Sequence, residues 1–571
     1  MKKVLLCAFI LVFRIQISVV YSQNPAPYFE PKVIDSSRSL FGSASIPLIT
    51  DFEKDGQSEI VTFSVAKSTI VQPITMLHVL DSKGNNYRNF PKGFDEVPLD
   101  FASGDLDGNG YLELVVRFNN KIDAIDLNGN RMPGFPIEYI TTGLDLISFV
   151  SLFDLDNDGK LEIIVSRKNE VCVYNFNGTV RDNWPQRIPG FARYNPAICD
   201  LDNDGNAEMI LNTYKPVGNN IDSAAIFVFK ENGTPFGFQW PLFHDSGYYS
   251  WSSSPSVFQD PNNKEIIILN VSGKVIDGMA FGRHKFLKIN KYGEVLTKKY
   301  YQEYYDYGTL VIGDLDKDGL LEFATGTQTG FSLSAFDNSL NRLQGWPQNG
   351  GGEHYATAFI GKLTYDNSLN LINNTWIADD SGGYIFAYKK DASNLSWSPL
   401  RSAGLVNSIA LSDINNDGNV ELVSLSTKTG NETILNIWTF PGIQFNQENF
   451  PWPMYAHDRY RTNQYGFIPP DEPVGIQPIS TNVPDKFSLH QNYPNPFNPG
   501  TIIRYSLIEN RFTTLKIFDA LGKEVAILVN EKQNAGTYEV DFDGSGLPSG
   551  IYFYRLSADG FNVSKRMILL K

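Results

Sequence analysis

Asp154-Leu155-Asp156-Asn157-Asp158-Gly159-Lys160-Leu161-Glu162 is the stretch of sequence that decides the fold, and the apolar run Ile163-Ile164-Val165 follows it directly. Oxygen-bearing side chains stand at its first, third, fifth and ninth positions, and glycine stands at the sixth. A hard cation such as Ca²⁺ takes about six to eight oxygens at about 2.3–2.6 Å. Glycine permits the tight turn that wraps so short a loop around one ion, because it tolerates a positive φ. The same pattern begins at five further residues, Asp51, Asp105, Asp200, Asp314 and Asp413.

The six loops supply the candidate metal ligands of the chain. By position these are Asp51, Glu53, Asp55 and Glu59; Asp105, Asp107, Asn109 and Glu113; Asp154, Asp156, Asp158 and Glu162; Asp200, Asp202, Asp204 and Glu208; Asp314, Asp316, Asp318 and Glu322; and Asp413, Asn415, Asp417 and Glu421. They include 22 of the 63 acidic residues, which leaves 41 acids against 48 basic residues elsewhere. The net charge of −15 therefore belongs to the loops, and about six structural Ca²⁺ ions would cancel most of it.

The loops are one marker of an internal repeat. They begin roughly 50 residues apart, and the two wider gaps hold degenerate copies in residues 256–268 and 358–378. A second marker, an aromatic residue followed by proline, recurs in the same phase at Phe90-Pro91, Phe135-Pro136, Trp184-Pro185, Trp240-Pro241, Trp346-Pro347 and Phe450-Pro451, with Trp397-Ser398-Pro399 as a variant. Two markers that keep one phase indicate eight units.

Each unit reads as antiparallel strands. Alternating apolar runs precede and follow each acidic loop, and a third run usually ends in an Asn-Gly turn such as Asn128-Gly129 or Asn177-Gly178. Three or four short strands per unit without helical periodicity predict an all-β, eight-bladed β-propeller. Seven blades would follow if a degenerate unit only completed its neighbour, and a β-solenoid is the other alternative.

These repeats resemble the FG-GAP/VCBS-type repeats of integrin α-like propellers over about residues 35–465. The resemblance implies that the acidic loop joins the first and second strands of each blade and binds Ca²⁺. Glutamate at the ninth position departs from the aspartate of the integrin-type loop. The sequence leaves open whether this longer side chain binds the ion or braces the loop.

Residues 1–22 read as a secretory signal peptide, with Lys2 and Lys3 before an apolar core and small residues before Gln23.

Cys172 and Cys199 fall in predicted strands and are expected to be buried free thiols, with a disulfide as the alternative. No later segment is apolar enough to span a membrane, and no basic stripe points to nucleic acid.

A proline-rich linker is predicted over residues 467–483, after a propeller domain spanning residues 23–466. Residues 484–571 then predict seven short strands, in residues 487–489, 501–507, 514–518, 524–529, 537–542, 551–558 and 562–570, which suit a small Ig-like β-sandwich. The run Gln491-Asn492-Tyr493-Pro494-Asn495-Pro496-Phe497-Asn498-Pro499 and the closing Lys565-Arg566-Met567-Ile568-Leu569-Leu570-Lys571 resemble the type A C-terminal sorting domain of the type IX secretion system. That resemblance implies partnership with the secretion machinery and a secreted or outer-membrane surface location. It leaves open whether the domain is removed and whether the product is anchored or released.

The sequence favours a non-catalytic binding or adhesion protein for a glycan or protein ligand. Two aromatic stretches, with Tyr248, Tyr249, Trp251, Tyr304, Tyr305 and Tyr307, form the candidate ligand face. The six histidines do not cluster, and neither a nucleophile elbow nor a phosphate loop is present, so no catalytic residue is predicted. The alternative function is a polysaccharide-degrading enzyme, since some eight-bladed propellers with similar loops resemble rhamnogalacturonan lyases. The fold alone names no ligand.

Overall fold

The structure is a computed structural model, and it is all-β over the residues that it describes. These are residues 24–40, 46–66, 73–139, 149–167, 169–192, 194–217, 220–244, 253–276, 279–303, 308–326, 332–349, 358–376, 382–428, 432–469, 486–508, 511–520, 522–533, 536–544, 547–558 and 561–570. The predicted signal peptide lies outside them, as does most of the predicted linker. Within this part of the chain no helix is long and apolar enough to cross a membrane.

Seven successive units each form one four-stranded antiparallel sheet, paired in chain order. The first three sheets are β3 (Leu48–Thr50), β4 (Glu59–Val65), β5 (Thr75–Leu80) and β6 (Lys92–Phe94); β7 (Asp100–Gly104), β8 (Glu113–Arg117), β9 (Lys121–Ile125) and β10 (Ile137–Glu138); and β11 (Val150–Phe153), β12 (Glu162–Arg167), β13 (Glu170–Tyr174) and β14 (Gln186–Arg187). The next two are β15 (Ala197–Cys199), β16 (Glu208–Val217), β17 (Asn220–Phe229) and β18 (Leu242–Phe243); and β19 (Ser256–Gln259), β20 (Ile266–Ile276), β21 (Met279–Asn290) and β22 (Val295–Glu303). The sixth and seventh are β23 (Val311–Gly313), β24 (Glu322–Gly326), β25 (Ser332–Phe336) and β26 (Gln348–Asn349); and β27 (Phe359–Gly361), β28 (Asn370–Trp376), β29 (Gly383–Tyr388) and β30 (Leu400–Arg401).

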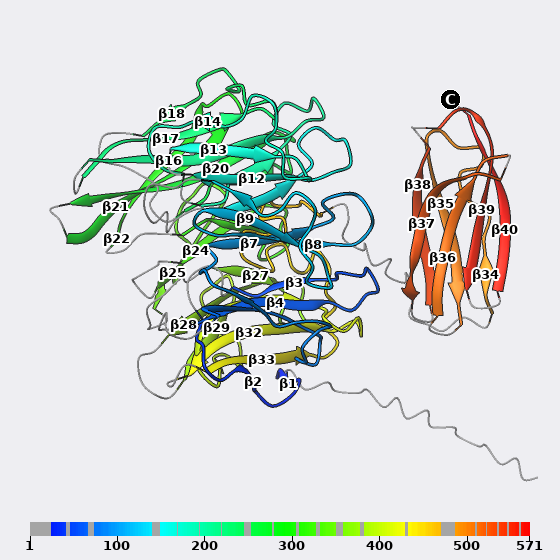
Figure 1. Ribbon diagram of the computed structural model, residues 1–571, viewed down its shortest axis with the longest axis horizontal. Helices are drawn as coiled ribbons and strands as arrows, with labels where there is room; N and C mark the ends of the chain where they lie inside the picture. The colour runs from blue at the N-terminus through cyan, green and yellow to red at the C-terminus, as the bar shows by residue number, and fades with distance from the viewer. Residues whose placement is uncertain are drawn as a thin grey trace, which may run out of the picture.

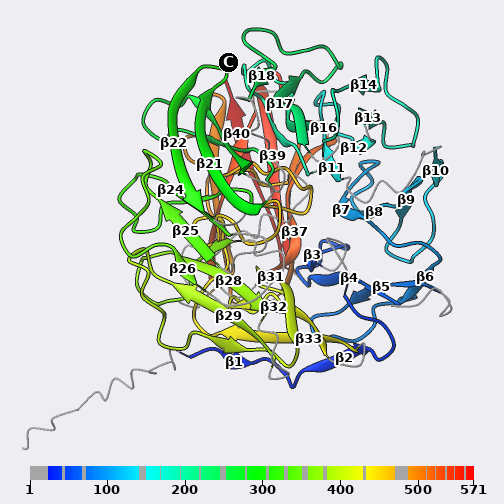
Figure 2. The same cartoon turned by 90° about the vertical axis from the view of Figure 1, so that its left-hand side faces the viewer.

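An eighth sheet combines the two ends of the repeat region. It contains β31 (Leu405–Ser412), β32 (Val420–Lys428) and β33 (Glu432–Phe440), and its outer edge is supplied by β1 (Ala26–Pro27) and β2 (Lys32–Asp35), which both pair with β33. Figure 2 shows β1 and β2 beside β33, although about 400 residues separate them in sequence. Strand β31 in turn contacts β3 of the first sheet. The eighth sheet therefore joins the beginning of the array to its end.

Residues 449–467 run past the innermost strands of the sheets and connect them. Ser103, Leu152, Ile198 and Val257, from four different sheets, donate their backbone N–H groups to the carbonyls of Arg459, Tyr460, Thr462 and Asn463 at 2.9–3.1 Å. Trp452 exchanges backbone hydrogen bonds with Ile360, and Pro453 accepts from Leu411. This axial segment is buried although it is rich in charged and polar residues. A satisfied buried polar network fixes one arrangement of its neighbours, so the axial segment sets the position of at least six sheets.

The aromatic–proline marker stands where the chain turns into the outer strand. Strands β6, β10, β14, β18, β26 and β30 each begin directly after that proline. The tryptophans also connect neighbouring sheets, because Trp184, Trp240 and Trp346 donate their indole N–H groups to Glu231, Lys291 and Lys390 carbonyls at 3.3, 2.9 and 2.8 Å. Phe450-Pro451 differs from the other copies. It leads into the axial segment, because the outer strands of the eighth sheet come from the N-terminal end.

The C-terminal strands form a separate body in Figure 1. All seven predicted strands are confirmed, as β34 (Ser488–Leu489), β35 (Gly500–Leu507), β36 (Arg511–Phe518), β37 (Glu524–Gln533), β38 (Gly536–Asp543), β39 (Gly550–Ala558) and β40 (Phe561–Leu569). They make one sheet of order β34-β35-β38 and another of order β37-β36-β39-β40. Buried side chains of both sheets, among them Tyr505, Tyr538, Ile517 and Tyr554, form one hydrophobic core.

Both cysteines of the repeat region are buried free thiols, as expected. Cys172 packs in the cluster between the second and third sheets, and Cys199 packs in the cluster between the fourth and fifth.

Candidate metal centres

The acidic loops are built alike, because the first and fifth residues organise the turn. The first aspartate accepts the N–H of the glycine at position six, as in Asp154 with Gly159 at 2.8 Å and Asp200 with Gly205 at 2.9 Å. The same contact occurs in the other four loops at 2.7–2.9 Å. Glycine is required there because φ at position six is 84–95° in all six loops. Position four is also left-handed, for example at Asn157 (φ 58°), which explains the frequent asparagine.

The ninth residue both braces the loop and faces the metal position. In all six loops one oxygen of this glutamate accepts the N–H of the residue at position two, as in Glu208 with Leu201 at 2.8 Å and Glu113 with Leu106 at 2.9 Å. The glutamate stands at or next to the start of the second strand and is almost fully buried. The other oxygen of Glu208 accepts no hydrogen bond from the described residues, although the side chain is 0% exposed. A buried carboxylate oxygen without a hydrogen bond is costly unless a cation approaches it.

Four loops bring three carboxylates together. One oxygen from each of the first, third and ninth residues lies within 4.8 Å of the others in the sets Asp105, Asp107, Glu113; Asp154, Asp156, Glu162; Asp200, Asp202, Glu208; and Asp314, Asp316, Glu322. Two ligands of one Ca²⁺ ion lie at most about 5 Å apart, so these sets fit a single ion. Metal ligation would account for this spacing.

The remaining predicted ligands are arranged differently. In the first loop Glu53 turns to Arg88 and to the hydroxyl of Tyr87, and the loop is not among the four sets. In the last loop the neutral Asn415 donates to Asp417 at 3.0 Å. The fifth residue of every loop, Asp55, Asn109, Asp158, Asp204, Asp318 or Asp417, accepts the N–H of residue seven at 2.8–2.9 Å.

Burial changes the protonation of these acids. It raises the pKa of Glu113 and of Glu208 to about 8, and that of Glu162 to about 7, where the nearby Arg181 partly opposes the shift. Burial likewise raises the pKa of Asp51 and of Asp413 to about 6. Because burial disfavours their charged form, binding of either a proton or a cation stabilises these carboxylates.

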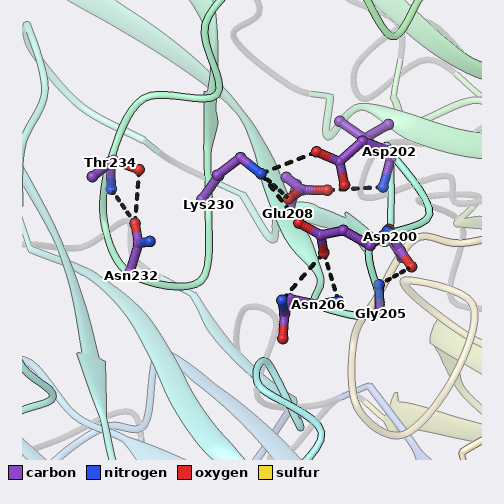
Figure 3. Close-up of polar contacts among 10 residues, drawn as sticks. Asp200, Asp202, Gly205, Asn206, Glu208, Lys230, Asn232 and Thr234 are labelled. Carbon is purple, nitrogen blue, oxygen red and sulfur yellow. Dashed lines mark hydrogen bonds and ion pairs between the residues drawn. The ribbon is translucent and has the colours of Figure 1, made fainter.

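Basic side chains reach all four sets. Lys54, from the first loop, has its Nζ 3.5 Å from Asp105 Oδ2. Figure 3 shows Lys230 pointing into the Asp200 loop, where its Nζ lies 3.0 Å from Asp202 and 3.8 Å from Glu208. Arg181 contacts Asp156 and Glu162 at 2.8 and 3.1 Å. Lys390, which comes from the neighbouring seventh sheet, contacts Asp316 and Glu322 at 2.7 and 2.9 Å.

Neighbouring loops are also joined to each other. The N–H at position eight of one loop donates to the carbonyl at position two of the preceding loop, as Leu161 does to Leu106 and Ala207 to Leu155. Ser58 donates to Ile414 at 3.0 Å, which connects the first loop to the last. A change at one loop is thereby transmitted to the backbone of the next.

The degenerate copy expected within residues 358–378 contains a loop built like the acidic ones. Residues 362–370 have the same nine-residue length between β27 and β28, and Asn370 accepts the N–H of Leu363 at 2.8 Å, as the glutamate does elsewhere. Lys362 occupies the position of the first aspartate. Leucines at positions two and eight, with Asp366 at position five, are the signal that could have delimited this loop. The loop keeps the contact between its second and ninth positions but has no acid at its first.

The predicted ligand face cannot be placed. Tyr248, Tyr249, Trp251, Tyr304, Tyr305 and Tyr307 all lie outside the described residues. The neighbouring Tyr300 is described and is 37% exposed, with the guanidinium carbon of Arg283 at 4.3 Å from its ring centroid.

Two sequence families match this chain. Residues 105–165 and 154–211 match the FG-GAP-like repeat, and residues 491–570 match the secretion system C-terminal sorting domain. Residues 105–211, which contain three of the acidic loops, are thus FG-GAP-like repeats. The chain is an FG-GAP-like repeat protein with a type IX secretion system sorting domain. This domain directs export, followed by secretion or attachment to the cell surface, and implies contact with the secretion machinery.

The solved structures that resemble this chain share little sequence with it. They include the Vibrio cholerae biofilm matrix protein Bap1 (11% identity, 74% of this chain and 94% of that chain, TM-score 0.38) and the rhamnogalacturonan lyase YesW (13%, 76% and 98%, 0.39). PorZ, a surface component of the type IX secretion system of Porphyromonas gingivalis, shares 11% identity over 95% of this chain and 86% of that chain, with a TM-score of 0.25. No curated protein matches the sequence. Sequence identities and TM-scores this low do not assign an activity to this chain.

Proposed function

We propose that the eight sheets are the blades of a closed β-propeller within residues 23–466, and that residues 484–571 form an Ig-like sandwich joined to it by a linker at 467–483. The hydrogen bond from Ser58 to Ile414 and the N-terminal strands on β33 support closure, because both join the first and last units. Propellers commonly avoid exposed sheet edges by such closure.

The acidic loops hold Ca²⁺ as a structural ion in this proposal, at about six sites. The observation that carries it is the close grouping of three carboxylates in four of the loops, with one oxygen from each within 4.8 Å of the others. A bound divalent ion would neutralise these charges and fix the turn between the first two strands of each blade. The first, third and ninth residues are the ligands best supported, and the fifth residue would complete the shell.

The protein acts as a non-catalytic binding or adhesion protein at the cell surface or in the medium. Metal binding accounts for the grouped carboxylates, so none is needed as an acid or base. Ser64, His78 and Asp35 do lie in contact, with Ser64 Oγ at 2.7 Å from Asp35 and 2.8 Å from His78. Ser64 is 0% exposed, however, and a buried hydroxyl cannot reach a substrate. This trio connects β2 to the first sheet and is structural.

The ligand is a glycan or a protein. Tyr300 and Arg283, on the outer strands of the fifth sheet, offer a flat ring with a cation beside it, which suits a sugar carrying a carboxylate. Figure 1 shows β21 and β22 extending beyond the neighbouring strands.

Two measurements test this proposal. Elemental analysis of the purified full chain should find calcium, and a chelator should lower its melting temperature. Incubation with insoluble and soluble polysaccharides should then give retention on one of them without products. Unsaturated products that absorb in the ultraviolet would instead support the polysaccharide lyase, and a chelator-insensitive, calcium-free protein would exclude the structural ions.

A further inference from the structure

A positive charge of the protein lies beside all four carboxylate sets, and in three of them it contacts both the third and the ninth residue. The three bases are Arg181, Lys230 and Lys390, and each follows the third strand of a sheet, namely β13, β17 and β29. Arg181 and Lys230 contact the loop of their own sheet, whereas Lys390 contacts the loop of the preceding sheet. The same contact with one pair of loop positions, made in three units, indicates a common role.

The contacts place each cationic group on oxygens that an ion would use. Lys390 Nζ lies 2.7 Å from Asp316 Oδ2 and 2.9 Å from Glu322 Oε1. Figure 3 shows Lys230 among Asp200, Asp202 and Glu208, with Nζ also 3.3 Å from Asp204 Oδ2. An ammonium group and a divalent ion would repel each other strongly at such a separation. Both cannot occupy one set of oxygens.

We propose that Arg181, Lys230 and Lys390 are internal counter-cations, which occupy the metal positions when divalent ions are scarce and move out to solvent when Ca²⁺ binds. The idea rests on the proposed calcium function of the same loops. It explains how clustered, buried carboxylates remain neutralised during export through compartments of different calcium content.

Exchange with the base lowers the affinity of these loops for Ca²⁺. Binding of Ca²⁺ must displace the base, so the affinity of each loop is lower than its three carboxylates alone would provide. Removing the base should therefore tighten binding. Lys390→Met keeps the apolar part of the side chain and removes the charge. Lys389→Met is the matched control, because Lys389 is the adjacent lysine but pairs with Asp366 at 3.8 Å, away from the acidic loop.

The test is a calcium titration of the full chain by calorimetry, in wild type, Lys390→Met and Lys389→Met. We expect Lys390→Met to lower the Kd of one site by about tenfold or more, since one unit charge is removed within about 3 Å of the ligands, and Lys389→Met to leave all sites unchanged. Equal or weaker binding in Lys390→Met would overturn the exchange. Absence of binding in every protein would refute the calcium function itself, together with this inference.

Wild-type protein offers a second readout that does not depend on any variant folding. Acylation of lysine amines, followed by mass spectrometry, reports how accessible each side chain is. Addition of Ca²⁺ should increase the modification of Lys230 and Lys390 several-fold and leave Lys389 unchanged. Calcium binding without a change at Lys230 and Lys390 would show that the ion and the base do not exchange, while the calcium sites themselves would stand.

Discussion

Replacement of Asp458 tests whether the axial segment holds the sheets together. Its carboxylate accepts hydrogen bonds from the N–H groups of Tyr460 and Thr462 at 2.8 and 3.4 Å, from the Thr462 hydroxyl, and from His457 Nδ1 at 2.9 Å. Asp458 is 5% exposed, so water replaces these partners poorly. Asp458→Ala would leave four donors without their acceptor.

The magnitude follows from those four donors. Each buried donor left without an acceptor costs about 1–3 kcal/mol, and some recover a water, so the loss is roughly 4 kcal/mol. Unfolding entropy is about 2 cal/mol/K per residue, which for the roughly 440 residues of the repeat region gives a fall in melting temperature of about 4–5 °C. Asp458→Asn retains one acceptor oxygen and should lose about half as much.

Differential scanning calorimetry of the full chain measures this effect. The control is Asp391→Ala, which removes an aspartate that accepts from the N–H and hydroxyl of Ser393 at 3.0 and 2.6 Å in an exposed turn. That loss should be within about 0.5 kcal/mol, as is usual for surface substitutions. If Asp458→Ala melted within 1 °C of Asp391→Ala, the axial segment would not be an integral part of the fold, and our account of the ring interior would be wrong.

Three further predictions concern other contacts. Trp240→Phe should cost about 1 kcal/mol, because it removes the indole hydrogen bond to the Lys291 carbonyl while it keeps a ring in place, and Trp240→Ala about 3–5 kcal/mol; thermal melts distinguish the two. Burial acts to raise the pKa of Asp35, but hydrogen bonds from His78, Ser64 and Ser37 outweigh it and hold that pKa well below its usual value. The resulting stabilisation is present above about pH 4 and is lost as the pH falls through the folded-state pKa, so the melting difference between wild type and Asp35→Asn should shrink from pH 7 to pH 3; a constant difference would contradict this. Burial raises the pKa of Cys172 to about 11, and Cys199 is buried as well, so both thiols should resist alkylation at pH 8 in the folded protein and react fully in denaturant, and rapid labelling of the folded state would show that these strands open.

The acidic loops were predictable because they are local. All the hydrogen bonds that shape a loop connect residues at most seven positions apart, such as Glu208 with Leu201 and Asp200 with Gly205. The strand pattern around them follows the two-residue alternation of apolar side chains. The seven C-terminal strands were predicted for the same reason. The degenerate copy within residues 358–378 was predicted, but its loop at 362–370 was not delimited, because its leucines and Asp366 survive while the acids at positions one, three and nine are replaced.

The bracing role of the ninth glutamate required coordinates. The sequence left binding and bracing as alternatives, and the structure shows the bracing contact, with Glu208 Oε2 on the Leu201 N–H. Binding of an ion through Oε1 belongs to our proposal. The basic partners could not be found from sequence either. Lys390 lies 68 residues from Glu322 in the chain, and a pattern search has no reason to connect them.

The sequence by itself determined the repeat, the acidic loops, the antiparallel strands around them and the change of character after the repeats, while it left seven and eight units open. Tertiary structure alone decided how the array begins and ends, with β1 and β2 completing the eighth sheet and residues 449–467 passing along the inner strands. The physical reason is the range of the interactions. A nine-residue turn is shaped by hydrogen bonds within itself, whereas the hydrogen bond from the Thr433 hydroxyl to the Arg38 carbonyl joins residues 395 apart in sequence, a separation that no local pattern reveals.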